Sequence, residues 1–226
     1  CTSVTVNNNT FSVPVIASTS TSYLIYCSNA TPTITVNGNA TSGAINKTGA
    51  GGFYGYYNFG SPTSGTVTIS NNNFSNITLT GASTFYGIYQ ATSTTQVEKV
   101  QNNTVSGITG GSSQIYGIYV SYGAAGSEIS GNIVSSMTAA AAISGIQLGT
   151  TASASISIFG NRVNTLSSTG ASLVIGILHA AGTTSNIYKN KVYDLQGSNA
   201  SSTMNGIQVS GGTTVNVYNN YVGDLR

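Results

Sequence analysis

The feature that most limits the fold of this chain is an asparagine that returns every 29 to 33 residues from one end of the sequence to the other. Each copy has an apolar residue three positions earlier, and most copies have another two positions later. The eight copies are Asn9, Asn39, Asn72, Asn103, Asn132, Asn161, Asn190 and Asn220. A second marker, an Ile or Tyr preceded by Gly, follows six of them after 14 to 17 residues, at Tyr56, Ile88, Ile118, Ile146, Ile177 and Ile207. Two markers held in phase along a chain indicate a repeat architecture.

Each repeat contains short β-branched stretches of alternating polarity, separated by Asn, Gly and Ser. No segment shows a sustained 3.6-residue apolar period, so helices that connect parallel strands are not expected. A unit of about 30 residues without a helix cannot bury its own apolar side chains, whereas stacked units bury them against one another. We therefore predict an all-β fold, one right-handed parallel β-helix (a solenoid) over residues 1–226, with about 7 to 8 coils. The coils are expected to begin near residues 1, 33, 66, 97, 126, 155, 184 and 214.

The repeated asparagine is expected at a bend between two strands of each coil. Asn tolerates the left-handed backbone conformation that such bends require. Successive coils lie about 4.8 Å apart, so the asparagines should form a column in which hydrogen bonds pass from coil to coil. This column is predicted to have a structural role.

Stacking also accounts for the low content of charged residues, 4% of the chain. A charge repeated in every coil would repel its copies about 4.8 Å away. In the column four residues before the asparagines, Lys99 and Glu128 fall in adjacent coils, where we expect an exposed ion pair. The net charge is +2 without a basic cluster, which argues against nucleic-acid binding. The longest apolar runs, such as residues 173–178, are too short to cross a bilayer.

Aromatic residues recur at fixed positions of the repeat and are the first candidates for a binding surface. One column, expected to face outward, contains Tyr26, Tyr57, Tyr89 and Tyr119. A second column, expected to face inward, contains Tyr23, Tyr54, Tyr86 and Tyr116. A third, again outward, lies two residues before the asparagines at Phe159, Tyr188 and Tyr218. Exposed aromatic ladders indicate either a surface for sugars or proteins, or aromatic pairing between strands without a ligand, and both interpretations stay open here.

Two acidic residues share the repeat position four after the asparagine, Asp194 and Asp224. Stacked carboxylates about 5 Å apart suit a retaining glycosidase pair or a shared Ca²⁺. However, the same position holds turn residues in the other coils, namely Asn76, Gly107, Ser136 and Thr165. We therefore predict two turn residues, no catalytic residues and no cofactor, with Ca²⁺ at this pair as the alternative.

The single histidine, His179, falls in a mostly inward column without a second histidine or a paired acid, so a packed position is expected. The only cysteines, Cys1 and Cys27, fall near one edge of the first coil. A disulfide between them would suit an oxidising, exported location, and a small buried apolar role for Cys27 is the equal alternative.

The Ile-x-x-Asn-x-Val pattern with its trailing Gly-Ile strand resembles the right-handed parallel β-helix repeat family along the whole chain. The charge-poor, Asn-, Gly- and Thr-rich sequence is similar to large secreted surface and adhesin-like proteins of Bacteroidetes-type bacteria, which often leave the cell by a type 9 secretion route. The family includes polysaccharide lyases, adhesins, phage fibres and passive spacers. Its lyases use acidic clusters for Ca²⁺ with a Lys or Arg base, and here only Arg162, Lys189 and Lys191 lie near Asp194 and Asp224.

The resemblance implies an extracellular or cell-surface location and a non-enzymatic structural or adhesive role, as a stalk, fibre or adhesin segment. The alternative is a carbohydrate-binding or polysaccharide-cleaving β-helix; ice binding by outward threonines is a weaker one. The first strand begins near residue 1 and the last repeat stops within a coil. We therefore expect a segment of a longer repetitive protein, with surface glycans or further copies stacked end to end as partners. Nucleic acid and a membrane span are not expected.

Overall fold

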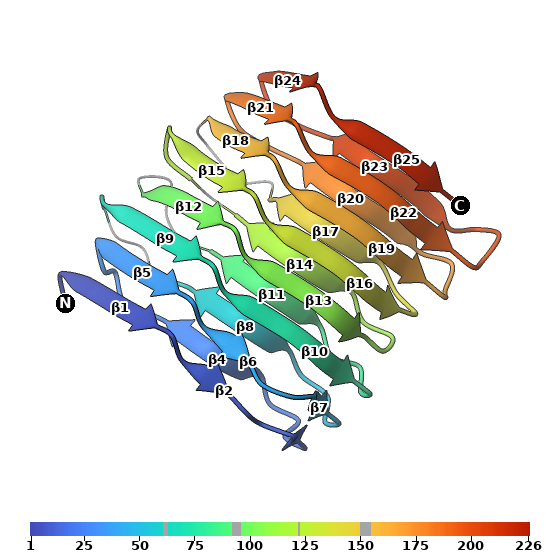
Figure 1. Ribbon diagram of the computed structural model, residues 1–226, viewed down its shortest axis with the longest axis horizontal. Coiled ribbons are helices and arrows are strands. Elements are labelled where there is room, and N and C mark those ends of the chain that lie inside the picture. The colour runs from blue at the N-terminus through green and yellow to red at the C-terminus, as the bar shows by residue number, and fades with distance from the viewer. Residues whose placement is uncertain (61–62, 92–95, 122, 150–154) are drawn as a thin grey trace.

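The computed structural model describes residues 1–60, 63–91, 96–121, 123–149 and 155–226, and these residues form strands and turns without a helix. Figure 1 shows the strands stacked into one right-handed solenoid, with two sheets in the front layer and a third sheet behind them. We call the front sheets A and B and the rear sheet C. The first seven coils run through them in that order and the last coil through A and B, and all strand pairs join equivalent strands of neighbouring coils in parallel. The structure therefore confirms the predicted solenoid, with about 30 residues in each coil.

Sheet A opens each coil. Its strands are β1 (Ser3–Asn7), β5 (Thr33–Asn37), β9 (Thr66–Ser70), β12 (Val97–Gln101), β15 (Ser127–Ser130), β18 (Ile156–Phe159), β21 (Thr184–Tyr188) and β24 (Thr214–Tyr218).

Sheet B follows after a short bend that we call the A–B bend. Its main strands are β2 (Thr10–Phe11), β6 (Ala40–Thr41), β10 (Asn73–Leu79), β13 (Thr104–Thr109), β16 (Ile133–Ala139), β19 (Arg162–Ser168), β22 (Lys191–Gly197) and β25 (Tyr221–Leu225). Two short strands continue it in the first coils, β3 (Val15–Ile16) and β7 (Ile45–Lys47).

Sheet C closes each coil behind the other two. Its strands are β4 (Ser22–Cys27), β8 (Phe53–Asn58), β11 (Phe85–Gln90), β14 (Ile115–Val120), β17 (Ile143–Leu148), β20 (Leu173–His179) and β23 (Thr203–Val209).

The core is a set of apolar columns that run along the solenoid axis. The strand register keeps equivalent repeat positions opposite one another, so one column in sheet A contains Val36, Ile69, Val100, Ile129, Ile158 and Ile187. These side chains are buried, and each contributes about 1.5–3 kcal/mol to folding. Only stacking makes this burial possible, which is why the repeat and the fold require each other.

The repeated asparagines form a hydrogen-bonded ladder inside the A–B bend, and the six from Asn39 to Asn190 are buried. The side-chain amide of each asparagine donates to the Oδ1 of the next, with N–O distances of 2.8 to 3.0 Å in all seven links. The same Oδ1 also accepts from the backbone N–H of the preceding asparagine, as Asn132 Oδ1 does from Asn103 N at 2.9 Å. The amide further donates to a carbonyl of the preceding coil, as Asn132 Nδ2 does to Val100 O at 2.9 Å.

One detail of this bend differs from our expectation. The left-handed residue is the one before the ladder asparagine, and in the eight coils it is Asn8, Gly38, Asn71, Asn102, Gly131, Gly160, Lys189 and Asn219. The ladder asparagine itself does not have a positive φ. Its identity is therefore required by the buried hydrogen bonds and not by the backbone conformation.

The second repeat marker marks a break in the alternation of sheet C. In β8, residues Phe53, Gly55, Tyr56 and Asn58 are buried, whereas Tyr54 and Tyr57 are partly exposed. Two consecutive residues thus face inward, and a Cβ on Gly55 would lie 2.5 Å from the carbonyl oxygen of Gly87. Glycine is required because the backbones of adjacent coils and the facing side chains leave no room for a methyl group.

This break makes our expectation for the second tyrosine column wrong. Tyr23, Tyr54, Tyr86 and Tyr116 face outward, because the extra inward residue places positions three apart on the same face. A strict two-residue alternation, which we assumed, would have placed them on opposite faces.

Candidate functional site

The outer face of sheet C carries the most distinctive surface of the molecule, which we call the tyrosine face. It consists of two adjacent columns in the first four coils: Tyr23, Tyr54, Tyr86 and Tyr116 in one, and Tyr26, Tyr57, Tyr89 and Tyr119 in the other. Ring centroids within a column are 4.5 to 5.6 Å apart. Rings of the two columns also contact each other, as Tyr54 and Tyr57 do at 5.0 Å. The result is a continuous sheet of aromatic rings along the solenoid.

Most of these rings are stacked with a sideways offset. Parallel rings in contact are separated by about 3.5 Å, so centroids about 5 Å apart mean that each ring is displaced sideways from the next. Part of each ring face is then left uncovered, and two rings are clearly exposed, Tyr26 at 51% and Tyr23 at 39%. Tyr119 differs, since it meets Tyr116 edge-on at 90°.

Four of the hydroxyl groups on this face have a raised pKa. Burial within the stack, reinforced by the neighbouring tyrosines, raises the pKa of Tyr54 and of Tyr57 to about 12. The same causes raise the pKa of Tyr86 and of Tyr116. These four hydroxyl groups are therefore neutral at pH 7, and each can donate and accept a hydrogen bond.

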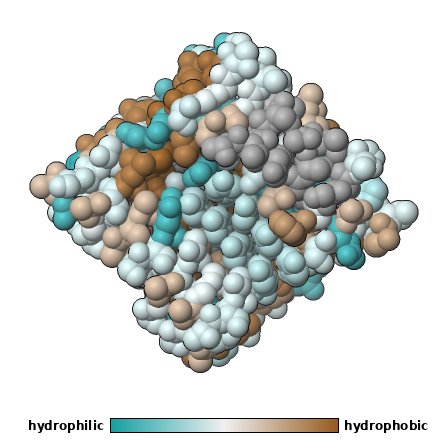
Figure 2. Space-filling view, turned by 180° about the vertical axis from the view of Figure 1, so that it is seen from behind, coloured by the Kyte–Doolittle hydropathy of each residue, from teal (hydrophilic) through white to brown (hydrophobic). Residues whose placement is uncertain are grey.

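The tyrosine face ends after the fourth coil. In β17, β20 and β23 the first column continues as Ser144, Ile175 and Asn205, and the second as Gln147, Leu178 and Gln208. Figure 2 shows the side of the molecule on which sheet C lies, with a pale, weakly hydrophilic area in the middle and hydrophobic atoms gathered at the upper left. The tyrosines thus form a bounded patch and are not a general property of the repeat.

A second aromatic ladder lies at the end of sheet A in the last three coils. Phe159 and Tyr188 have centroids 5.0 Å apart with planes 8° from parallel, and Tyr188 and Tyr218 are 5.1 Å apart at 1°. These residues are the last of β18, β21 and β24, directly before the A–B bend. The ladder is partly exposed, and Tyr218 most so at 45%.

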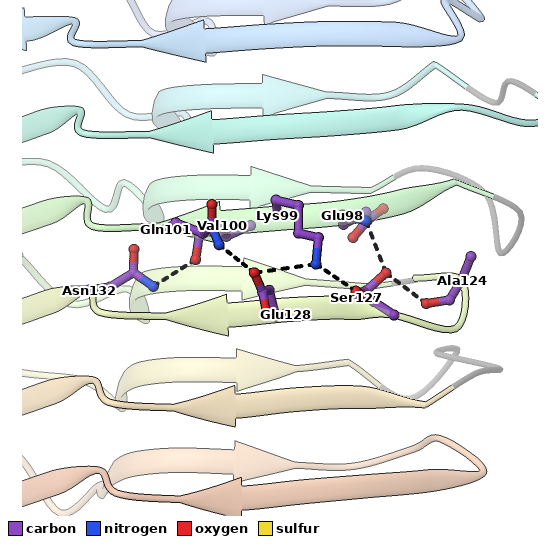
Figure 3. Close-up of polar contacts among 9 residues, drawn as sticks. Glu98, Lys99, Val100, Gln101, Ala124, Ser127, Glu128 and Asn132 are labelled. Carbon is purple, nitrogen blue, oxygen red and sulfur yellow. Dashed lines mark hydrogen bonds and ion pairs between the residues drawn. The ribbon is translucent and has the colours of Figure 1, made fainter.

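The predicted ion pair between adjacent coils is present in sheet A. Lys99 Nζ lies 3.3 Å from Glu128 Oε1 (Figure 3). Lys99 also donates to the carbonyl oxygen of Gly126 at 2.9 Å, and Glu128 accepts from the side chain of Gln101. These contacts explain both charges without any catalytic role.

Because this ion pair is partly exposed, its contribution to stability should be small. In a double-mutant cycle with Lys99→Met and Glu128→Gln, we expect a coupling energy of at most about 1 kcal/mol, measured by urea denaturation. The coupling should shrink further in 1 M salt, where exposed charges are screened. A coupling above about 2 kcal/mol that persists in high salt would contradict this view of the pair.

The structure also contains a buried polar chain that our sequence analysis missed. The Tyr56 hydroxyl donates to Gln90 Oε1 at 3.3 Å, and Gln90 Nε2 donates to Glu98 Oε1 at 3.2 Å. The Glu98 backbone N–H donates to Ser127 Oγ at 2.9 Å, and Ser127 donates to the carbonyl of Ala124 at 2.7 Å (Figure 3). Burial is the main cause that raises the pKa of Tyr56 well above its ordinary value.

Lys47 is a second buried charge that we missed. Its Nζ donates to the carbonyl oxygens of Ser18 at 2.8 Å and Ser20 at 3.2 Å. Burial lowers the pKa of its ammonium group. Register could have revealed it, because Lys47 pairs with Ile16 and Leu79 in an inward column.

Asp194 and Asp224 lie at turn positions. Both have a left-handed backbone, with φ of 57° and 53°, like their repeat equivalents Asn76, Gly107, Ser136 and Thr165. Arg226 contacts both carboxylates, and its Nη2 lies 2.9 Å from Asp194 Oδ1. A hydrogen bond from Gln196 is the main cause that lowers the pKa of Asp194, with further lowering from Thr165 and Arg226.

His179 is the last residue of β20, and its side chain is buried. Its Nδ1 donates to the carbonyl oxygen of Gly211 at 3.0 Å. Burial lowers the pKa of the imidazole, with this hydrogen bond acting in the opposite direction. Among the described residues its Nε2 has no hydrogen-bond partner, so the ring is held as a packed, neutral side chain.

Neither cysteine forms a disulfide in the structure. Cys1 is exposed and its thiol donates to the carbonyl oxygen of Ser3 at 2.8 Å. Cys27 is half-buried beside the Tyr56 hydroxyl, and burial raises the pKa of its thiol. An open depression of about 150 Å³ adjoins Cys27 between β1, β4 and β5.

Within the part of the chain that the structure describes, no three His, Cys, Asp or Glu residues come together as a metal site. The described residues also contain no helix with the length and hydropathy needed to span a membrane.

No protein-family model matches this chain, and neither a curated protein nor a solved structure is significantly similar to it.

Proposed function

We propose that this chain is a non-enzymatic structural and adhesive module, a β-helical stalk that is secreted or displayed on a bacterial cell surface and contacts glycans through its tyrosine face. The observation that carries the proposal is the set of eight outward tyrosines arranged in two contacting columns over four coils. Aromatic side chains with a polar tip suit surfaces that are apolar on one side and wet on the other. A sugar ring presents the same combination of C–H groups and hydroxyls.

Several further features support a stalk. Hydrogen bonds of the sheets and the asparagine ladder link every coil to the next along one axis. The surface is polar but nearly uncharged, with 4% charged residues in the chain. The extracellular location and the export route follow only from the resemblance to secreted bacterial surface proteins.

Polysaccharide cleavage has less support than binding. The candidate carboxylates, Asp194 and Asp224, are turn residues that share Arg226. They also lie in the last two coils, whereas the tyrosine face covers the first four.

The proposal is tested with an array of neutral and charged glycans and the double variant Tyr57→Ala/Tyr89→Ala. We expect the wild-type chain to bind a subset of the glycans and the variant to bind them at least about tenfold more weakly, a loss of about 1.4 kcal/mol. Both exchanges remove partly exposed rings from the centre of the tyrosine face.

A matched control is the double variant Gln147→Ala/Gln208→Ala, because these residues occupy the same repeat column in coils without tyrosine. It should bind like the wild type. Release of sugar from a bound glycan over hours would overturn the non-enzymatic assignment. Equal binding by the wild type and the tyrosine variant would remove the tyrosine face from the proposal.

A further inference from the structure

Aromatic and basic residues gather at the A–B bend in the last three coils and nowhere else along it. Here the last residue of sheet A is Phe159, Tyr188 or Tyr218, and the first residue of sheet B is Arg162, Lys191 or Tyr221. Lys189 lies between them at the left-handed position. In the first five coils the corresponding pairs are neutral and polar or aliphatic: Asn7 and Thr10, Asn37 and Ala40, Ser70 and Asn73, Gln101 and Thr104, Ser130 and Ile133. We call this region the aromatic–basic bend.

In the described part of the chain, the few acidic residues are buried or paired elsewhere, which leaves the cations of this bend without an ion-pair partner. The sequence has six basic and four acidic residues. Glu98 is buried in the core and Glu128 pairs with Lys99, while Asp194 and Asp224 share Arg226. The remaining basic residues are Lys47, which is buried against carbonyl groups, and the three cations of the bend, Arg162, Lys189 and Lys191.

These three cations are exposed to solvent. The closest acidic residue along the same strand, Asp194, pairs with Arg226, whose Nη2 lies 2.9 Å from its Oδ1. The excess positive charge of the molecule is thus concentrated at one place, which corrects our expectation that the basic residues do not cluster.

Two features of this arrangement suit a bound anionic ligand. Arg162 and Lys191 are direct neighbours in the register of β19 and β22, and like charges opposite each other destabilise a sheet. Beside them, Lys191, Tyr193 and Tyr221 line an open depression of about 400 Å³ with a largely apolar lining. An anion at this position would relieve the repulsion, and an apolar ring face would cover the exposed tyrosines.

We propose that the aromatic–basic bend is a second binding site, distinct from the tyrosine face, and that its ligand is an acidic polysaccharide. The cations recognise the carboxylate or sulfate groups of the sugar chain. The ladder of Phe159, Tyr188 and Tyr218 runs along the solenoid axis at 5.0 and 5.1 Å per ring, so an extended polymer lying parallel to the axis meets one aromatic ring in each coil. Nearly parallel rings at this spacing leave no gap into which a nucleic-acid base could insert, which favours a sugar chain over a nucleic acid.

The test measures the affinity of the intact chain for two matched pairs of polymers. Polygalacturonate is compared with its fully methyl-esterified form, and dextran sulfate with dextran, so that the two members of each pair share a sugar backbone and differ in its anionic groups. We expect binding to the charged member of at least one pair, and the pair that binds identifies carboxylate or sulfate as the group recognised. The double variant Lys189→Gln/Lys191→Gln should bind it at least about tenfold more weakly. It should also lower the slope of log affinity against log salt by about two.

The control Thr10→Glu/Thr104→Glu changes the net charge by the same amount at the same repeat position of coils 1 and 4, and should keep the affinity within about twofold. Tyr188→Ala should weaken binding and Tyr188→Phe should not.

Circular dichroism and urea denaturation establish that each variant is folded. The proposal is overturned if the wild type does not prefer the charged polymers, if the threonine control loses as much affinity, or if single-stranded DNA binds as tightly. The Tyr57→Ala/Tyr89→Ala variant should bind the charged polymer normally, so this site and the tyrosine face can fail independently.

Discussion

Replacing Asn132 with alanine should destabilise the protein by about 4 kcal/mol, the largest effect that we expect from any single exchange. The Asn132 side chain donates to Val100 O and Asn161 Oδ1 and accepts from the backbone and side-chain amides of Asn103, all at 2.9 or 3.0 Å. Asn132 and its ladder neighbours are at most 1% exposed, so water cannot replace these bonds. Each buried polar group left without a partner costs about 1–3 kcal/mol. Urea denaturation monitored by far-ultraviolet circular dichroism measures the loss.

The matched control is Asn102→Gly, at the preceding position of the bend in the fourth coil. Asn102 has a φ of 54° and is exposed, and glycine occupies the equivalent position at Gly38, Gly131 and Gly160. The free energy of unfolding of the Asn102→Gly variant should differ from that of the wild type by no more than about 0.5 kcal/mol. Similar losses for the two variants would contradict the distinction between a ladder asparagine and a bend asparagine.

The second large effect is expected from Gly117→Ala in sheet C, which should destabilise the protein by about 3 kcal/mol. A methyl group at Gly117 would lie 2.5 Å from both the carbonyl oxygen of Gly145 and a methyl of Val134. Neither neighbour can move freely, because Gly145 belongs to the paired strand and Val134 is buried. The urea midpoint measures the loss, and near-ultraviolet circular dichroism reports whether the stacked tyrosines keep their packing.

Gly160→Asn is the control for this exchange. Gly160 has a φ of +64°, but an added Cβ would have no heavy atom closer than 3.9 Å. Asparagine already adopts this conformation at Asn8, Asn71, Asn102 and Asn219, so the change should stay within about 1 kcal/mol. If Gly117→Ala were equally mild, the backbones of neighbouring coils would have to be farther apart than the structure places them.

The fold could be predicted from the sequence because its main determinant is local and repeated. An asparagine every 29 to 33 residues, in phase with a Gly-Ile pair, leaves stacked coils as the arrangement that buries the apolar columns. The pairing of Lys99 with Glu128 followed from the same register without any structural information. Repeat phase therefore predicts contacts as well as secondary structure.

The orientation of the tyrosine columns could not be predicted in this way. The two-residue alternation is interrupted at Gly55 and its equivalents, where two consecutive positions face inward. A glycine has no side chain whose polarity would reveal its direction, so the pattern did not show the interruption. The tyrosine face consequently has eight outward tyrosines, whereas we expected only the four of one column to face outward.

The aromatic–basic bend escaped detection for a different reason. Arg162 and Lys191 are 29 residues apart in the sequence, and a search for runs of charge does not find them. The repeat register that predicted the pair of Lys99 and Glu128 also makes them neighbours, so a comparison of repeat positions would have found the cluster. The same holds for Lys47 and Glu98, whose burial follows from the direction of individual positions and not from residue type.

The asparagine ladder gives the solenoid a direction. In all seven links the side-chain amide donates toward the higher-numbered coil, so the amide dipoles point the same way and polarise one another, an effect of about 10–30% per bond. A further coil can extend this series only if it presents an acceptor to one end or a donor to the other. Any filament built by adding such coils is therefore head-to-tail, with two chemically different ends.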